Sequence, residues 1–306
     1  MSDARIVSLI ASATEIVAAL GFEDSLVGRS HECDFPPSVQ RLPVCTAPKL
    51  NVQGTSLEID QRVKAALQDG LSVYHVDAEK LRQLRPDVIV TQSHCEVCAV
   101  SLKDVEQAVC DWIESRPKIV SLAPNALADV WTSIRQVAEA LHAPERGEAF
   151  VAQLRQRMAA IADRASALAE RPTVVCIEWI EPLMAAGNWM PELVEMAGGV
   201  NVIGEAGKHS PGMTWECLCE KNPEAIVVLP CGWDMRKAKE EMPSLTRKPE
   251  WRGLTAVRTG RVYLTDGNQY FNRPGPRLVE SLEILAEVLH PGKFAFGHKG
   301  KGWERL

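Results

Sequence analysis

Four cysteines of this 306-residue chain lie in segments that follow short β-branched runs. They are Cys33, Cys95, Cys98 and Cys231. Thiolates bind zinc, iron–sulfur clusters and other soft metals, and the C-x-x-C spacing of Cys95 and Cys98 brings two sulfurs within reach of one metal centre. If the strand ends lie together, these four thiols predict a metal site with an open position for a substrate.

Two other interpretations of the cysteines stay open. A free cysteine is most often a small hydrophobic core residue, which suits Cys110 and Cys176 with their apolar neighbours. It suits Cys33 and Cys95 less well, because their neighbours in the sequence are His, Glu and Asp. The C-x-x-C pair also has the spacing of a redox dithiol.

Two histidines, His31 and His94, lie beside these cysteines and are alternative metal ligands. Imidazole coordinates zinc, iron and the cobalt of a corrinoid. A loop histidine more often faces solvent or hydrogen bonds to the backbone, so both roles remain open.

Aromatic residues gather in predicted strand-end loops of the second half. These are Trp179, Trp189, Trp233, Tyr270 and Phe271. Flat rings can stack on a conjugated ligand, and since only 6% of the chain is aromatic, the concentration favours a bulky, partly apolar ligand over a bare ion. Arg273 then pairs with ligand carboxylates or phosphate, or alternatively caps the last helix.

Polar side chains follow the first strands of the chain as well. Ser12 and Thr14 stand where a helix is expected to begin. They could offer hydroxyls and N–H groups to a ligand, or one of them could be an ordinary helix N-cap. Glu32 follows the second strand. We expect all three to contribute to ligand binding.

Short β-branched runs alternate with segments of helical period, for example 88–91 before 101–112 and 118–122 before 126–141. This alternation predicts an α/β fold of two Rossmann-like lobes with mostly parallel sheets. Ligands of such sheets bind beyond the carboxyl ends of the strands, which is where the residues above lie.

The pattern divides the chain into an N-terminal lobe at 1–123, a helical linker at 124–171 and a C-terminal lobe at 172–306. The linker includes Pro144 to Arg171, which has one apolar stripe and could span roughly 40 Å as a single helix. This helix either bridges the lobes or packs as an ordinary domain helix.

The composition of the chain limits which partners it could bind and in which compartment it could work. The 34 Lys and Arg against 40 Asp and Glu give a net charge of −6, which argues against nucleic acid. No apolar run is long enough for membrane insertion, and no signal peptide is recognised. Together with nine cysteines in no regular framework, this predicts a cytoplasmic protein. Common catalytic motifs are missing, so the enzyme question stays open.

Several segments taken together resemble a known family. They are SLIASATE at 8–15, LRPDVIV at 84–90, GNWMPELVEMAGGVNV at 187–202, and VRTGRVY at 257–263 before RPGPR at 273–277. Their order and spacing are similar to class III solute-binding proteins, which include the cobalamin-binding proteins of ABC importers. The resemblance implies two α/β lobes bridged by one long helix, with a tetrapyrrole or metal chelate held in the cleft between them.

The sequence therefore predicts a cytosolic binding protein for a small molecule, either cobalamin, another corrinoid or tetrapyrrole, or a metal chelate. The alternative is a cysteine-ligated metalloprotein with an iron–sulfur cluster or zinc and an enzymatic or sensing role. An ABC permease becomes a partner only if an export leader precedes this sequence.

Overall fold

The computed structural model describes residues 4–68, 72–93, 102–110 and 116–306. The chain forms two compact units. Unit 1 comprises Met1–Gly54, Gln61–Pro124 and Ala128–Gln153, and unit 2 comprises Thr55–Asp60, Asn125–Leu127 and Leu154–Leu306. The predicted α/β class is confirmed, and each unit is built around its own sheet.

Unit 1 contains a four-stranded, all-parallel sheet, sheet A, in the order β2-β1-β5-β6. Its strands are β1 (Ile6–Ser8), β2 (Leu26–Arg29), β5 (Val88–Gln92) and β6 (Lys118–Leu122). The β-branched residues of β1 and β5 are buried, as expected for strands covered on both faces. Because Ser8 pairs with both Val90 and Arg29, the carboxyl ends of these strands reach the same edge.

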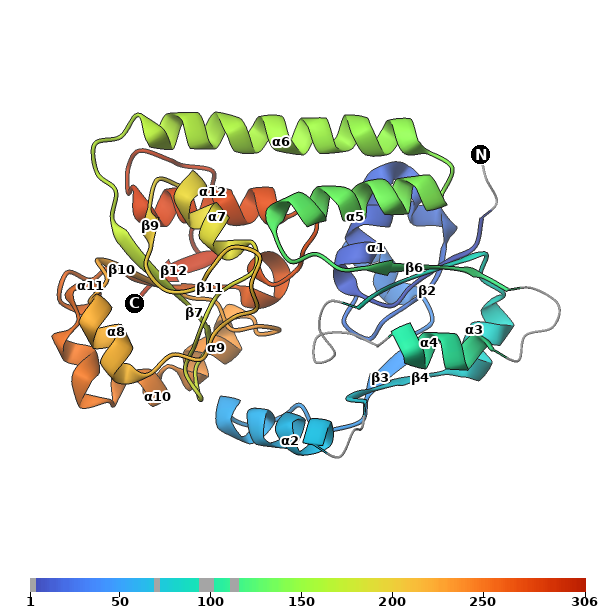
Figure 1. The fold of residues 1–306 in the computed structure, drawn as a ribbon, viewed down its shortest axis with the longest axis horizontal. Coiled ribbons are helices and arrows are strands. Elements are labelled where there is room, and N and C mark those ends of the chain that lie inside the picture. The colour runs from blue at the N-terminus through green and yellow to red at the C-terminus, as the bar shows by residue number, and fades with distance from the viewer. Residues whose placement is uncertain (1–3, 69–71, 94–101, 111–115) are drawn as a thin grey trace. The chain divides into compact units, whose positions relative to one another are not determined.

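Helices cover both faces of sheet A (Figure 1). They are α1 (Ala11–Val17), α3 (Ala78–Leu84), α4 (Leu102–Val109) and α5 (Leu127–Ala140). Leu81 of α3 and Val105 of α4 pack with Val7 and Ile89 in the core between the sheet and these helices. A separate antiparallel pair, β3 (Thr46–Pro48) and β4 (Tyr74–Val76), flanks a sequence excursion that contains α2 (Ser56–Gln68).

Unit 2 contains a mixed six-stranded sheet, sheet C. Parallel strands β7 (Thr173–Trp179), β10 (Ala225–Val228) and β11 (Val262–Thr265) form its centre. The antiparallel strands β8 (Met184–Ala185) and β12 (Trp303–Arg305) lie at its edges, and β9 (Val200–Asn201) pairs with the start of β7.

Helices also cover sheet C, with α12 and α7 on one side and α8, α9 and α11 on the other (Figure 1). The bounds are α7 (Met190–Met196), α8 (Trp215–Lys221), α9 (Met235–Glu241), α10 (Pro243–Thr246), α11 (Thr255–Arg258) and α12 (Leu278–Leu289). Every residue of α12 except Glu280 and Glu283 is buried, so this helix belongs to the core of unit 2.

The predicted long helix is α6 (Pro144–Ser166), which ends before the expected Arg171. Its residues divide between the units, since those up to Gln153 belong to unit 1 and those from Leu154 to unit 2. Among the described residues, no helix has the length and apolar character needed to cross a bilayer.

Candidate functional site

The carboxyl edge of sheet A carries a network of hydroxyls around one thiol. Thr14 Oγ1 lies 2.8 Å from Ser8 Oγ and 2.9 Å from the sulfur of Cys33. All three residues are buried, and Ser12 on the same helix is buried as well.

The N-cap interpretation of Ser12 and Thr14 is wrong, because Ile10 occupies the N-cap of α1 and no side chain caps that helix. Ser12 and Thr14 instead lie inside the first turns of α1.

His31 is fixed by the loop that follows β2. Its backbone N–H donates to Thr46 Oγ1 at 3.1 Å, and its ring Nδ1 lies 2.8 Å from the same oxygen. Thr46 Oγ1 in turn lies 3.1 Å from Ser30 Oγ. Burial, assisted by the nearby Arg29 charge, lowers the pKa of His31 below its ordinary value of 6.5. The imidazole is therefore neutral at pH 7.

Tyr74 and Glu32 complete this part of the edge. The rings of His31 and Tyr74 lie 5.4 Å apart, and Tyr74 Oη donates to Glu32 Oε1 at 3.4 Å. Glu32, one of the predicted ligand-binding residues, is thus placed beside the histidine.

The carboxyl edge of sheet C carries a pair of indoles. The rings of Trp179, at the end of β7, and Trp233, after β10, lie 5.1 Å apart and are inclined by 49°. Trp233 follows a turn in which Gly232 has a φ of +74°, and Asp234 caps α9 through the N–H of Lys237. The ammonium of Lys237 lies 5.0 Å from the centre of the Trp233 ring. Trp179 is half-buried and Trp233 is buried.

The next loop along this edge holds the predicted anion-binding residue Arg273. Its Nη2 donates to Asn268 Oδ1 at 2.9 Å, and only 5% of Arg273 is exposed. Asp266, directly after β11, accepts the N–H of Gln269, while burial raises the pKa of Asp266. The helix-capping alternative for Arg273 is wrong, because Arg277 occupies the N-cap of α12.

Three predicted stacking residues are covered by the protein itself. Trp189 donates its Nε1–H to the carbonyl of Phe271 at 2.9 Å, and Phe271 has no exposed surface. Tyr270 is also buried, with the guanidinium of Arg277 4.4 Å from its ring centre. Their contact with a ligand stays a prediction, whereas Trp179 is only half-buried.

The four predicted thiol ligands are not joined by any described contact. Cys33 belongs to unit 1 and Cys231 to unit 2, while Cys95, Cys98 and His94 lie outside the described residues. Within the described ranges no three His, Cys, Asp or Glu side chains gather as possible metal ligands. The metalloprotein alternative therefore receives no support from this part of the chain and stays a prediction.

Of the two cysteines predicted to be core residues, one is buried and one is exposed. Cys176 is a core residue as expected, and burial raises its pKa to about 12. The prediction for Cys110 is wrong, because this residue is exposed at the end of α4. Its apolar neighbour Val109 faces the core instead, since successive helical residues point in different directions.

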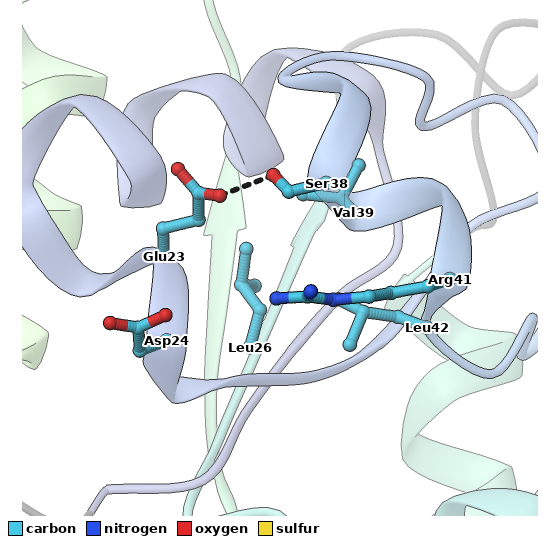
Figure 2. A pocket seen from close by; sticks show the side chains of 7 residues that line it. All are labelled: Glu23, Asp24, Leu26, Ser38, Val39, Arg41 and Leu42. Carbon is cyan, nitrogen blue, oxygen red and sulfur yellow. Dashed lines mark hydrogen bonds between the residues drawn. The ribbon is translucent and has the colours of Figure 1, made fainter.

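A small pocket of about 140 Å³ lies at the opposite end of sheet A, where β2 begins at Leu26 (Figure 2). Ser38 donates a hydrogen bond to Glu23 across it, and the guanidinium of Arg41 lies over Leu26. Small-molecule sites usually enclose about 300–1,000 Å³, so this pocket is too small for a tetrapyrrole. It is not part of the predicted strand-end site.

Two residues near the indole pair were not predicted from the sequence. Ser56 donates to Glu241 through its backbone N–H and its hydroxyl, and its carbonyl accepts the indole N–H of Trp179 at 3.2 Å. The sequence signals only the start of α2, through the Thr55-x-x-Glu58 capping pattern. Nothing in it relates Ser56 to a residue 185 positions away.

Comparison with known proteins gives consistent matches along nearly the whole chain. The family model described as "Periplasmic binding protein" matches residues 6–269. The uncharacterized ABC transporter substrate-binding lipoprotein YvrC of Bacillus subtilis is 25% identical over 299 residues, covering 95% of this chain and 81% of the relative. The vitamin B12-binding protein of Vibrio cholerae is 22% identical over 298 residues, covering 93% and 88%.

Solved structures show the same fold. The apo form of the periplasmic heme-binding protein RhuT from Roseiflexus sp. RS-1 superimposes with a TM-score of 0.70 at 23% identity. The match covers 94% of this chain and 98% of that one.

Proposed function

Since the chain belongs to the periplasmic binding protein family, we propose that it binds a metal tetrapyrrole, either a corrinoid or haem. The names of similar proteins support these two ligand classes, because one relative is a vitamin B12-binding protein and one structural neighbour is a heme-binding protein. Both ligands are large conjugated rings whose central metal can accept an imidazole nitrogen, and whose ring faces can stack on aromatic side chains.

The observation that carries this proposal is the environment of His31. When Nδ1–H donates to Thr46 Oγ1, the Nε2 lone pair is the one left for a metal, and the lowered pKa keeps the ring neutral. A metal-binding histidine typically donates its other ring N–H in this way, which fixes the tautomer and the ring orientation. We propose that His31 Nε2 is the axial ligand of the bound iron or cobalt.

The edge of sheet C supplies the complementary contacts in this proposal. Trp179 and Trp233 stack on the macrocycle, and Arg273 pairs with carboxylate or phosphate groups at its rim. These groups stand at the carboxyl ends of their strands, where ligands of open α/β sheets bind.

The proposal is tested by titrating the purified protein with haem, aquocobalamin and cobinamide while recording the visible spectrum and the heat of binding. We expect saturable binding at micromolar concentration or tighter, and a shifted metal-ligand spectrum. His31→Ala should weaken binding at least about tenfold, equivalent to about 1.4 kcal/mol, and abolish the spectral shift.

The matched control is His75→Ala, an exposed histidine on β4 next to Tyr74, which should leave affinity and spectrum unchanged. Thr46→Val should weaken binding about tenfold because it removes the acceptor that orients His31. No binding of any of the three ligands, or an unchanged spectrum in His31→Ala, contradicts the proposal.

We further propose that the protein works in the cytosol. The described cysteines, seven of the nine in the sequence, are all free thiols, which suits a reducing compartment. Fractionation of the source cells with an antibody against the untagged protein tests this. Recovery from the exported fraction would contradict it and make an ABC permease the expected partner.

A further inference from the structure

The first turn of α2 makes an unusual set of contacts in unit 2. The chain enters unit 2 at Thr55 and leaves it after Asp60. Thr55 and Glu58 cap the helix reciprocally, since Thr55 N–H donates to Glu58 Oε2 at 2.9 Å and Glu58 N–H lies 3.3 Å from Thr55 Oγ1. The N–H and hydroxyl of Ser56 are therefore available for another acceptor.

That acceptor is Glu241, the last residue of α9. Its Oε1 accepts the Ser56 N–H at 3.1 Å and the Ser56 hydroxyl at 2.8 Å, with Ser244 Oγ at 3.4 Å. Ser56 has no exposed surface and Glu241 only 6%. Burying a carboxylate is unfavourable unless hydrogen bonds compensate for the lost water, so this cluster holds Ser56 in one place.

Because Ser56 is fixed, its carbonyl oxygen is fixed as well, and Trp179 hydrogen bonds to this oxygen. The indole has a single polar atom, Nε1–H, and it donates to the Ser56 carbonyl. This bond selects one rotation of the Trp179 ring, which then meets Trp233 at 5.1 Å and 49°. The ammonium of Lys237 makes a cation–π contact with the Trp233 ring at 5.0 Å from its centre, and this contact does not involve Ser56.

We propose that Ser56 and Glu241 are positioning residues that set the angle of Trp179 for ligand stacking. Together they turn the two indoles into a fixed aromatic shelf, defined as the rings of Trp179 and Trp233. This role rests on the proposed binding of a flat ligand. The first turn of α2 would then contribute to ligand recognition indirectly, by orienting Trp179. A pre-set ring costs less entropy when the ligand binds.

The test combines a signature of the shelf with ligand affinity. Two coupled indoles give an exciton couplet in far-ultraviolet circular dichroism, assigned to this pair by its loss in Trp179→Phe. We expect Ser56→Ala and Glu241→Ala to reduce the couplet and to weaken haem and cobinamide binding about threefold to tenfold, the size of one aromatic stacking contact. Glu241→Gln, which keeps an acceptor oxygen, should retain the couplet and most of the affinity.

The matched control is Glu240→Gln, an exposed neighbour paired with Arg236, which should change neither readout. A lower melting temperature with an unchanged couplet and unchanged affinity in Ser56→Ala would show a merely structural contact and overturn the proposal. If Glu241→Ala does not fold, Ser56→Ala, which loses one hydroxyl, decides the question. If the parent protein binds none of the probe ligands, the proposed function fails, while the couplet still reports whether Ser56 and Glu241 hold Trp179.

Discussion

At the scale of single residues, His31 is the clearest link between structure and chemistry. Its two contacts to Thr46 Oγ1 and its lowered pKa both arise from its half-buried position in the loop after β2. A neutral imidazole with one nitrogen hydrogen-bonded can donate its other lone pair to a metal, whereas an imidazolium cannot.

The pH dependence of binding follows from this pKa. Because burial lowers the pKa of His31 from its ordinary value of 6.5, haem affinity should stay nearly constant between pH 8 and pH 7, and it should fall at lower pH as the ring becomes protonated. Titrations across this range measure the effect. The His31→Ala variant should lack this step, and an affinity loss already complete at pH 7 would contradict the assignment.

Gly267 gives a second prediction for single residues. A Cβ at this position would lie 2.2 Å from the carbonyl oxygen of Pro230 and 2.7 Å from that of Leu229, both backbone atoms next to the turn that carries Trp233. Gly267→Ala should therefore destabilise the protein by about 1–3 kcal/mol.

Urea unfolding monitored by circular dichroism measures this change. Gly212→Ala is the control, because a Cβ there meets no atom within 4 Å, and it should shift stability by less than about 0.5 kcal/mol. Equal stability of the two variants would show that the close approach at Gly267 relaxes without cost.

At the scale of elements, the carboxylate of Glu287 on α12 forms hydrogen bonds to the C-terminal segment. Glu287 Oε1 accepts the backbone N–H groups of Phe296, Gly297 and His298, and Oε2 accepts the indole N–H of Trp303 at 2.6 Å. Since Trp303 begins β12, this carboxylate connects a core helix to an edge strand of sheet C.

Glu287→Ala should destabilise the protein by about 3 kcal/mol, because it leaves the buried indole N–H of Trp303 and three part-buried backbone N–H groups without this acceptor. Chemical denaturation measures the loss. Glu304→Ala, which breaks a surface ion pair to Lys239, is the control and should cost less than about 1 kcal/mol. If Glu287→Ala lowered the free energy of unfolding no more than Glu304→Ala, the stabilising role of the Glu287 hydrogen bonds would be contradicted.

Much of the element pattern was predictable from the sequence because local rules decide it. Arg85 and Asn222 are helix C-cap residues in the left-handed conformation, and each stands directly before a proline, which cannot continue the helix. The exposure of Cys110 was not predictable in this way, since apolar neighbours on a helix do not show which direction a residue faces.

The candidate site was predictable only in part. Ser12, Thr14 and His31 follow strands of sheet A, and Trp179 and Trp233 lie together at the carboxyl edge of sheet C, whereas contact of these residues with a ligand stays a prediction. The contact of Ser56 with Glu241 was missed because it depends on how the excursion before β4 folds, and no local pattern reports that. Burial of Phe271 likewise depends on packing of the whole sheet.

At the scale of the whole molecule, two α/β units and matches over nearly the full chain make this a member of a binding-protein family. Fold alone does not select the ligand, because the same fold serves a vitamin B12-binding and a heme-binding protein among its neighbours. The selection has to come from side chains at the strand ends, and the central claim is that His31 coordinates the ligand metal.

Comparing haem with metal-free protoporphyrin tests that claim most directly, because the two ligands differ only in the metal. We expect the parent protein to bind haem at least about tenfold more tightly than protoporphyrin, a difference of about 1.4 kcal/mol, and His31→Ala to bind both equally. Equal affinity of the parent protein for the two ligands, or the same preference for haem in His31→Ala, would contradict it.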